Sequence, residues 1–200
     1  MNSIDKHKTI NIQVVPFTIA DAIQAFTPDK SAFRCTIMHG CNCLKVMGSG
    51  VAKWIRETFP AAYKVDCDSD LGFEERLGKY TKVLETFETP EIQNILIYNL
   101  YTQLGVREFN NRTFQYTKPF SLSAFGDAFR AALYDLYDTK LTINSTAIWP
   151  FNYPIFLPCI GAGLGGGDWL EIQTELLKSA LDVSRTRNIT LPTIFVCIPI

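Results

Sequence analysis

The sequence has almost no excess of charge of either sign. Its 200 residues carry 19 Lys and Arg against 20 Asp and Glu, which gives a formal net charge of -1. A general nucleic-acid surface needs a clear basic excess, so this balance argues against that class of protein, although a local patch could be hidden in it. The apolar content of 47% and the charged content of 20% are those of a globular chain. We therefore expect one domain, with a sizeable core, over residues 1–200.

Long uninterrupted apolar runs are also missing. The most apolar stretch, residues 148–164, is broken by three prolines and therefore predicts no membrane helix. Residues 1–8 are polar with no apolar run behind them, so no signal peptide is expected. The six cysteines, at positions 35, 41, 43, 67, 159 and 197, lack the paired spacing of disulfide or zinc sites. These absences predict a reduced cytoplasmic protein with buried thiols and no metal.

The sequence lacks the Gly-Lys-Ser/Thr of a Walker loop, yet two glycine-rich segments lie where a strand pattern changes to a helix pattern. The first segment, Gly48-Ser49-Gly50, separates the apolar run 33–38 from a helical pattern that starts at Ser49 and is closed by Pro60. The second segment, residues 161–167, separates the run 155–160 from a helix that starts at Asp168. Glycines at such junctions let a ligand approach the backbone, and the new helix offers free N–H groups to an anion. The two segments predict one cleft for a phosphate-bearing ligand.

The remaining patterns alternate between strands and helices. Strands are expected at residues 10–15, 33–38, 80–87, 93–100, 155–160 and 193–198. Helices are expected at residues 20–26, 49–60, 121–137 and 168–183. Residues 66–78 are expected to form an exposed loop, residues 101–119 a long connection, and residues 139–154 an irregular segment. This order indicates an α/β fold with helices on both faces of a mixed or largely parallel sheet.

The second glycine segment also matches a dinucleotide fingerprint, Gly161-x-Gly163-x-x-Gly166. Only one further strand, residues 193–198, follows it, and that strand carries no acid for a ribose. A lone motif of this kind is weak, so a nicotinamide oxidoreductase is disfavoured.

Five blocks of sequence carry a resemblance to a known family. In chain order they are His39-Gly-Cys-Asn42, Gly48-Ser-Gly50-Val-Ala52, Phe59-Pro60-Ala-Ala-Tyr63, Asn99-Leu-Tyr-Thr-Gln103 and Ile160-Gly-Ala-Gly-Leu-Gly-Gly-Gly-Asp-Trp169. With these blocks the chain resembles the macrodomain family, which binds ADP-ribose, and most closely its subgroup similar to ADP-ribose 1''-phosphate phosphatases, which includes phage proteins. The resemblance covers the chain roughly from Phe33 onward and implies a three-layer α/β/α sandwich around a mixed, largely parallel sheet.

The resemblance also implies the ligand contacts. The first loop would hold one side of the phosphates, and the second loop would close over the diphosphate. The implied ligand-binding residues are Thr18, Ile19, Gly48, Ser49, Gly50, Val51, Gly161, Ala162, Gly163, Leu164 and Gly165.

The sequence departs from the family pattern at the residue that recognises the base. The family usually has an Asp after the first strand, which accepts a hydrogen bond from the adenine amino group. Thr18 occupies that place here, so weaker adenine selectivity is expected, with Asp21 as the acid that could substitute.

Three residues are candidates for catalysis, and each has a structural alternative. Asn42 would contact the distal ribose, or it could end its strand in a turn. His39 would protonate the leaving ribose oxygen or hold phosphate, or it could only order the loop. Asp168 would position a water, and it would also cap the helix that it begins. Tyr101-Thr102-Gln103 could line the pocket or pack at the sheet edge, and Trp169 is expected in the core.

The expected function is therefore binding of ADP-ribose or ADP-ribose 1''-phosphate by a monomer, followed by hydrolysis at the distal ribose. No cofactor is needed, because the loops supply the anion site. A hydrolase that removes ADP-ribose from protein or nucleic acid is the next candidate. A module that only binds or sequesters such nucleotides is the alternative from a different class.

Overall fold

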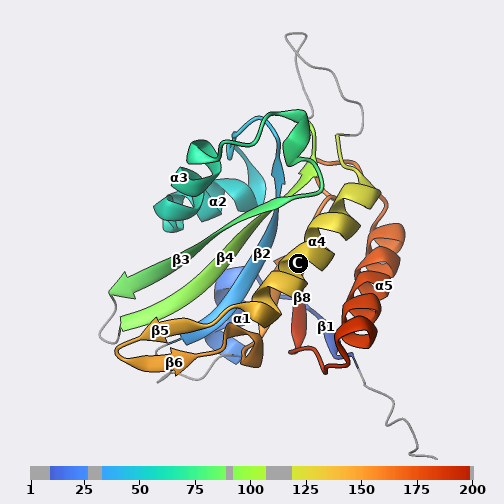
Figure 1. Ribbon diagram of the computed structural model, residues 1–200. Helices are drawn as coiled ribbons and strands as arrows, with labels where there is room; N and C mark the ends of the chain where they lie inside the picture. Colours follow the sequence, from blue (N-terminus) through green and yellow to red (C-terminus); the bar gives the residue numbers. More distant parts are fainter. Residues whose placement is uncertain (1–9, 27–32, 89–91, 107–118, 199–200) are drawn as a thin grey trace, which may run out of the picture.

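A six-stranded sheet forms the centre of the molecule (Figure 1). The computed structural model describes residues 10–26, 33–88, 92–106 and 119–198. The strands are β1 (Ile12–Val15), β2 (Phe33–Asn42), β3 (Tyr80–Glu88), β4 (Ile92–Gln103), β7 (Ile155–Pro158) and β8 (Ile194–Cys197). Their order is β1-β8-β7-β2-β4-β3, and every neighbouring pair is parallel except β3 and β4. The predicted mixed, largely parallel sheet is confirmed.

Helices cover both faces of this sheet and make the three layers. They are α1 (Ile19–Phe26), α2 (Gly50–Thr58), α3 (Pro60–Asp68), α4 (Leu122–Asp138) and α5 (Trp169–Arg187), with short 3-10 turns η1 (Glu74–Arg76) and η2 (Pro150–Asn152). Successive residues of a strand point to opposite faces. Leu96 and Tyr98 of β4 therefore pack with α4 and α5, whereas Ile95 and Ile97 pack with α1, α2 and α3. In Figure 1, α4 and α5 lie in front of the sheet and α1 lies behind it.

Strand β2 lies inside the sheet, between β7 and β4, with nine of its ten residues buried. Its nearly continuous apolar sequence is typical of a strand covered on both faces. It is longer than the apolar run 33–38 because His39, Gly40, Cys41 and Asn42 continue its pairing with β4.

The expected end of the second helix at Pro60 is wrong in one respect. Helix α2 ends at Thr58, but Pro60 is the first residue of α3, where a proline is tolerated because the N–H that it lacks would have no partner within the helix. The expected exposed loop at residues 66–78 is correct for residues 72–75, which are exposed, but wrong for Asp66 and Arg76, which are buried. Asp66 lies in the last turn of α3 and forms a buried ion pair with Arg76, which a polar sequence pattern cannot reveal.

Two further expectations need correction. Residues 139–154 are not irregular, since they contain the hairpin β5 (Leu141–Ile143) and β6 (Thr146–Ile148). Its two-residue turn, Asn144-Ser145, has φ angles of 49° and 63°, as this tight hairpin turn requires. Residues 101–103 belong to β4, with Tyr101 and Thr102 buried, so these residues pack within the sheet. Residues 107–118 of the long connection lie outside the described residues.

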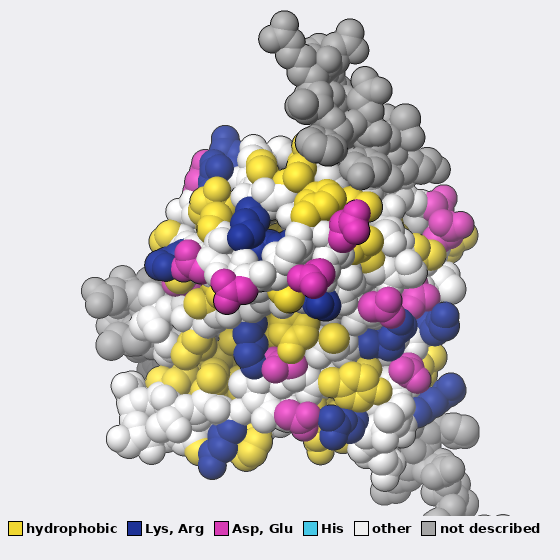
Figure 2. Space-filling model, turned by 45° about the horizontal axis from the view of Figure 1, so that its top comes forward, with side chains coloured by type: hydrophobic (Ala, Val, Ile, Leu, Met, Phe, Trp, Pro, Cys, Tyr) yellow, Lys and Arg dark blue, Asp and Glu magenta, His cyan; other side chains and the backbone are white. Residues whose placement is uncertain are grey.

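The charged side chains on one face of the molecule are as evenly mixed as the near-zero net charge suggests (Figure 2). On the face shown in Figure 2, Lys and Arg side chains are interspersed with Asp and Glu and form no patch of one sign. In the part of the chain that the structure describes, no helix combines the length and the apolar character needed to cross a membrane.

Candidate functional site

A cavity of about 360 Å³ lies between the N-termini of α1 and α2, at the carboxyl ends of β7 and β8. It is lined by Thr18, Ile19, Ala20, Gly50, Val51, Trp54, Pro158, Cys159 and Cys197. After β2 the chain continues into α2 and α3 on one face of the sheet. After the neighbouring strand, β7, it continues into α5 on the opposite face. Ligands of open α/β sheets bind at such a point, where connections diverge from the carboxyl ends of adjacent strands.

Helix α2 begins at the cavity without a side-chain cap. Ser49 occupies the N-cap position with extended backbone, but its hydroxyl caps no N–H group. The first intrahelical acceptor, Ser49 O, takes the N–H of Lys53 at 3.1 Å. Within the described residues, the N–H groups of Gly50 and Val51 therefore have no protein acceptor, although both residues line the cavity. A φ of +55° at Gly50 favours glycine there.

Helix α1 begins at the same cavity. Its N-cap residue, Thr18, accepts the N–H of Asp21 on its hydroxyl at 3.2 Å and the N–H of Ala22 on its carbonyl at 3.0 Å. The N–H groups of Ile19 and Ala20 remain without an acceptor among the described residues. Two helix N-termini thus meet at one cavity and give it positive potential without a cationic side chain.

The first loop, residues 43–49, is fixed from two sides. Asn42 accepts the N–H of Leu44 at 2.9 Å and donates its amide to Val46 O at 2.6 Å. Lys45, in the left-handed region at φ 59°, donates its Nζ to Cys67 O at 2.8 Å and to Ser69 O at 3.0 Å at the end of α3. These contacts hold the start of α2 in place.

The second loop is shaped by contact of its glycines with Phe120. A Cβ atom at Gly161 would lie 2.4 Å from the Phe120 ring, and one at Gly167 would lie 2.7 Å from it. Gly167 donates its N–H to Gly161 O at 2.9 Å, which closes the loop. Gly163 is different, because a Cβ atom there would meet no atom of the described residues within 4 Å. In the described structure, the N–H groups of residues 162–165 have no acceptor.

We expect Gly161→Ala to lower the free energy of unfolding by about 2–4 kcal/mol, since it adds strain at φ +78° to an overlap with the Phe120 ring. Gly163→Ala is the matched control in the same loop and should change that free energy by less than about 0.5 kcal/mol. Urea denaturation measures both values. Equal stability of the two variants would contradict the packing role of Gly161.

His39 lies in the interior and not at the cavity. Its side chain is 0% exposed, its Nε2 lies 2.7 Å from Asn99 Oδ1, and Cys41 Sγ lies 3.7 Å from its Nδ1. Desolvation by burial lowers the pKa of His39 to about 4, although the hydrogen bond with Asn99 opposes this shift. A neutral, enclosed imidazole fits the ordering role left open by the sequence better than proton donation to a bound ligand.

This burial predicts a pH dependence of stability. In the unfolded chain the His39 imidazole takes up a proton below about pH 6.5, whereas in the folded protein it does so only near pH 4. The unfolded state therefore binds more protons between these values, and stability is full above pH 6.5 and lost as the pH falls toward 4. We expect a loss of about 2–3 kcal/mol from this group by urea denaturation at pH 7 and pH 4. His39→Gln should flatten this pH dependence; an unchanged slope would assign it to other groups.

Asn42 and Asp168 both perform the structural roles expected of them. Asn42 ends β2 in a side-chain turn, and its amide keeps one N–H hydrogen beyond the bond to Val46. Asp168 caps α5 because its Oδ1 accepts the N–H groups of Leu170 at 2.8 Å and Glu171 at 3.1 Å. Asp168 Oδ2 has no hydrogen-bond partner within the described residues.

The structure brings together four of the predicted binding residues, namely Thr18, Ile19, Gly50 and Val51, as cavity lining. Gly48 and Ser49 adjoin them, and residues 161–165 follow Cys159 at the same edge without lining the cavity. Trp54 was not predicted, although its helical spacing from Gly50 and Val51 places it on their face of α2. Cys159 and Cys197 were not predicted either, because only the pairing of β7 with β8 brings these strand ends together.

All six cysteines are free thiols; Cys67 and Cys159 are half-buried, and the other four are buried. Among the described residues, no three His, Cys, Asp or Glu side chains are grouped so that they could hold a metal ion.

Comparison with known proteins gives a sequence relative and several structural ones. No protein-family model matches the chain. It is 31% identical over 171 residues to an uncharacterised 17.5 kDa protein of the tk-vs intergenic region of Enterobacteria phage T4, covering 84% of this chain and 88% of the phage protein.

Solved structures show the same fold. The macrodomain of Thermus aquaticus DarG superposes with a TM-score of 0.58 at 16% identity, over 94% of this chain and 98% of that one. Thermosipho africanus DarTG in complex with ADP-ribose gives a TM-score of 0.51 at 16% identity, over 96% of this chain and 42% of that one. The chain therefore has the macrodomain fold and belongs to the same protein family as the phage T4 protein.

Proposed function

We propose that this protein binds ADP-ribose or a derivative with its base in the cavity and its diphosphate along the two loops. The observation that carries the proposal is the set of backbone N–H groups at the carboxyl edge of the sheet, from the start of α2 and from residues 162–165, that lack an acceptor among the described residues. Backbone N–H groups at helix N-termini bind phosphate without a lysine. The likeness to DarTG, solved in complex with ADP-ribose, supports this ligand.

The diphosphate would lie against backbone N–H groups that no side chain covers. Among the described residues, a Cβ atom added at Gly50 or at Gly163 would meet no other atom within 4 Å, so the backbone is accessible at both loops. Glycine at both positions lets phosphate oxygens reach the N–H groups without a side chain in between. Asn42, with its remaining N–H, would contact the distal ribose at the start of the first loop.

We further propose hydrolysis at the distal ribose, with ADP-ribose 1''-phosphate as the substrate. Asp168 is the residue suited to this step, because its Oδ1 is held by the helix start while Oδ2 is free to accept a proton from water. The water oxygen would attack phosphorus, the bond between phosphorus and the ribose oxygen would break, and solvent would protonate the leaving oxygen. His39 takes no part, since it is enclosed.

Two measurements test this proposal. Calorimetric titration with ADP-ribose should show binding at one site, and phosphate release from ADP-ribose 1''-phosphate should exceed the rate in buffer. Asp168→Asn retains a good N-cap while removing the charge, so we expect intact binding and release slower by at least about tenfold. Binding without release would favour the module that only binds. An absence of binding would exclude both functions.

A further inference from the structure

We infer that this cavity accepts the base of its nucleotide by shape and stacking and does not select adenine over other purines. The inference rests on the proposed function. It begins with the described lining residues, none of which has a charged side chain. Apart from the indole N–H of Trp54, the side-chain hydrogen-bonding groups of these described residues are one hydroxyl, from Thr18, and two thiols, from Cys159 and Cys197.

The hydroxyl of Thr18 is already in use. It donates to Asp21 Oδ2 at 2.7 Å and accepts the N–H of Asp21 at 3.2 Å, so its single hydrogen is not available to a base. Asp21 itself does not line the cavity, and one of its carboxylate oxygens is engaged with Thr18. Burial raises the pKa of Cys197 to about 12, so its thiol stays neutral and is a weak hydrogen-bonding group.

At the start of α1 the backbone offers donors to the cavity. Thr18 O accepts from Ala22 N at 3.0 Å and Pro158 O accepts from Ile160 N at 2.7 Å, whereas the N–H groups of Ile19 and Ala20 are open among the described residues. An N–H group, whether of the backbone or of an indole, can donate to a ring nitrogen or to a carbonyl oxygen of a purine. The exocyclic amino group that distinguishes adenine is itself a donor, so these N–H groups cannot accept a hydrogen bond from it.

What remains is apolar contact. Trp54, Ile19 and Pro158 provide an aromatic ring and aliphatic surface for a planar base. Stacking tolerates any base, because every base has a π-face, and an apolar pocket discriminates poorly between ligands of the same shape. Adenine has a 6-amino group and an acceptor at N1, whereas hypoxanthine has a 6-carbonyl and an N1–H donor. Each base presents one acceptor on this edge, N1 in adenine and O6 in hypoxanthine, to an open N–H group, so the two should bind with similar affinity.

Calorimetric titration of the full chain with ADP-ribose and with inosine diphosphate-ribose tests this. We expect dissociation constants within about tenfold of each other, and a preference for ADP-ribose greater than that overturns the inference. Failure of ADP-ribose itself to bind would instead remove the proposed function, so the two outcomes are distinguishable.

Two variants sharpen the result. Asp21→Asn keeps an acceptor for the Thr18 hydroxyl and should leave the ratio of the two dissociation constants unchanged. A loss of ADP-ribose affinity alone in this variant would show that Asp21 selects adenine and would overturn the inference. Trp54→Leu should weaken both ligands by the same factor, about tenfold, as loss of one stacking platform does; weakening of ADP-ribose alone would also overturn it.

Discussion

Replacing Arg76 with methionine is expected to lower the free energy of unfolding by about 3–5 kcal/mol. The Arg76 guanidinium is 0% exposed and donates to Asp66 Oδ1 at 2.7 Å and to the carbonyl of Asp66 at 2.8 Å. It also lies 4.8 Å from the centre of the Tyr101 ring, whose hydroxyl donates to Asp66 Oδ1 at 2.8 Å. Removing the cation leaves a buried carboxylate with only this hydroxyl, and Asp66 Oδ2 already has no hydrogen-bond partner among the described residues.

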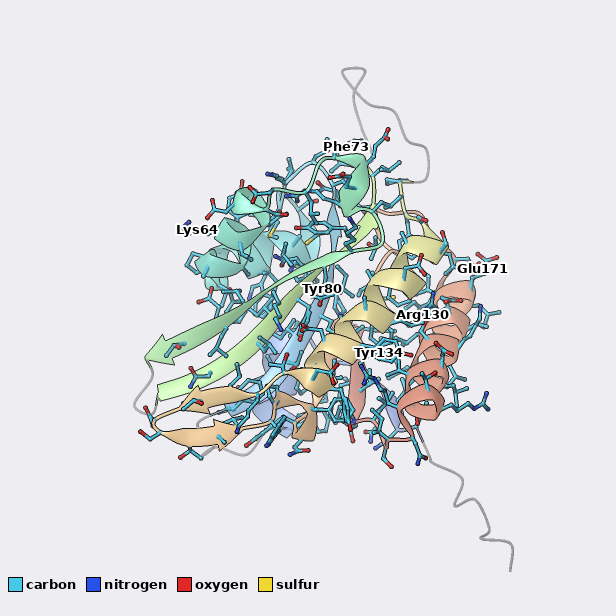
Figure 3. The ribbon with its side chains drawn as sticks, viewed as in Figure 1. Lys64, Phe73, Tyr80, Arg130, Tyr134 and Glu171 are labelled. Carbon is cyan, nitrogen blue, oxygen red and sulfur yellow. The ribbon has the colours of Figure 1, made fainter. Side chains whose placement is uncertain are left out.

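Lys64→Met is the matched control, because Lys64 forms an ion pair with Asp68 on the same helix but at the surface. Lys64 lies on α3 at the outside of the molecule in Figure 3, and loss of such an exposed pair costs less than about 1 kcal/mol. The double variant Asp66→Asn/Arg76→Met should recover at least about 1 kcal/mol relative to Arg76→Met, since it removes the unpaired charge. Guanidinium denaturation measures all three; equal losses for the Arg76 and Lys64 variants would contradict this account.

Val51→Glu is expected to weaken ADP-ribose binding by about a thousandfold, or about 4 kcal/mol. Val51 lines the cavity in the first turn of α2, where its N–H has no acceptor within the described part of the chain. A glutamate there stabilises the helix start, because it complements the helix dipole, so folding should be retained. The same carboxylate would occupy the cavity and repel the phosphates in a region of low dielectric.

Lys53→Gln is the control for the Val51 variant, since it makes the same change of net charge on the same helix at an exposed side chain outside the cavity. It should change the dissociation constant by less than about threefold in the same calorimetric titration. Undiminished binding by the Val51 variant, with native stability, would place the ligand elsewhere.

The edge where the ligand is proposed to bind could be predicted from the sequence. Glycine between a strand pattern and a helix pattern is a local signal, and it located Gly50 at a helix start where φ is positive. The capping role of Asp168 could also be predicted from its position directly before a helical pattern. The alternation of short apolar runs with helical patterns was sufficient for the α/β class and for the helices on both faces, because a strand covered on both sides is apolar almost throughout, whereas a helix covered on one side is apolar with a helical period.

The tertiary structure alone decided which of these residues share a cavity. Cys159 and Cys197 are far apart in the chain and become neighbours only through the pairing of β7 with β8. The pairing of Asp66 with Arg76 could not be predicted either, since polar residues in a loop pattern look alike whether they are solvated or paired in the interior. The role of His39 could not be predicted either. A histidine near a loop suggested acid catalysis, but the pairing of β2 with β4 buries its side chain against Asn99. Local pattern determines most of the strands and helices of the main sheet, whereas the desolvation of individual side chains and the meeting of strand ends depend on how those elements pack.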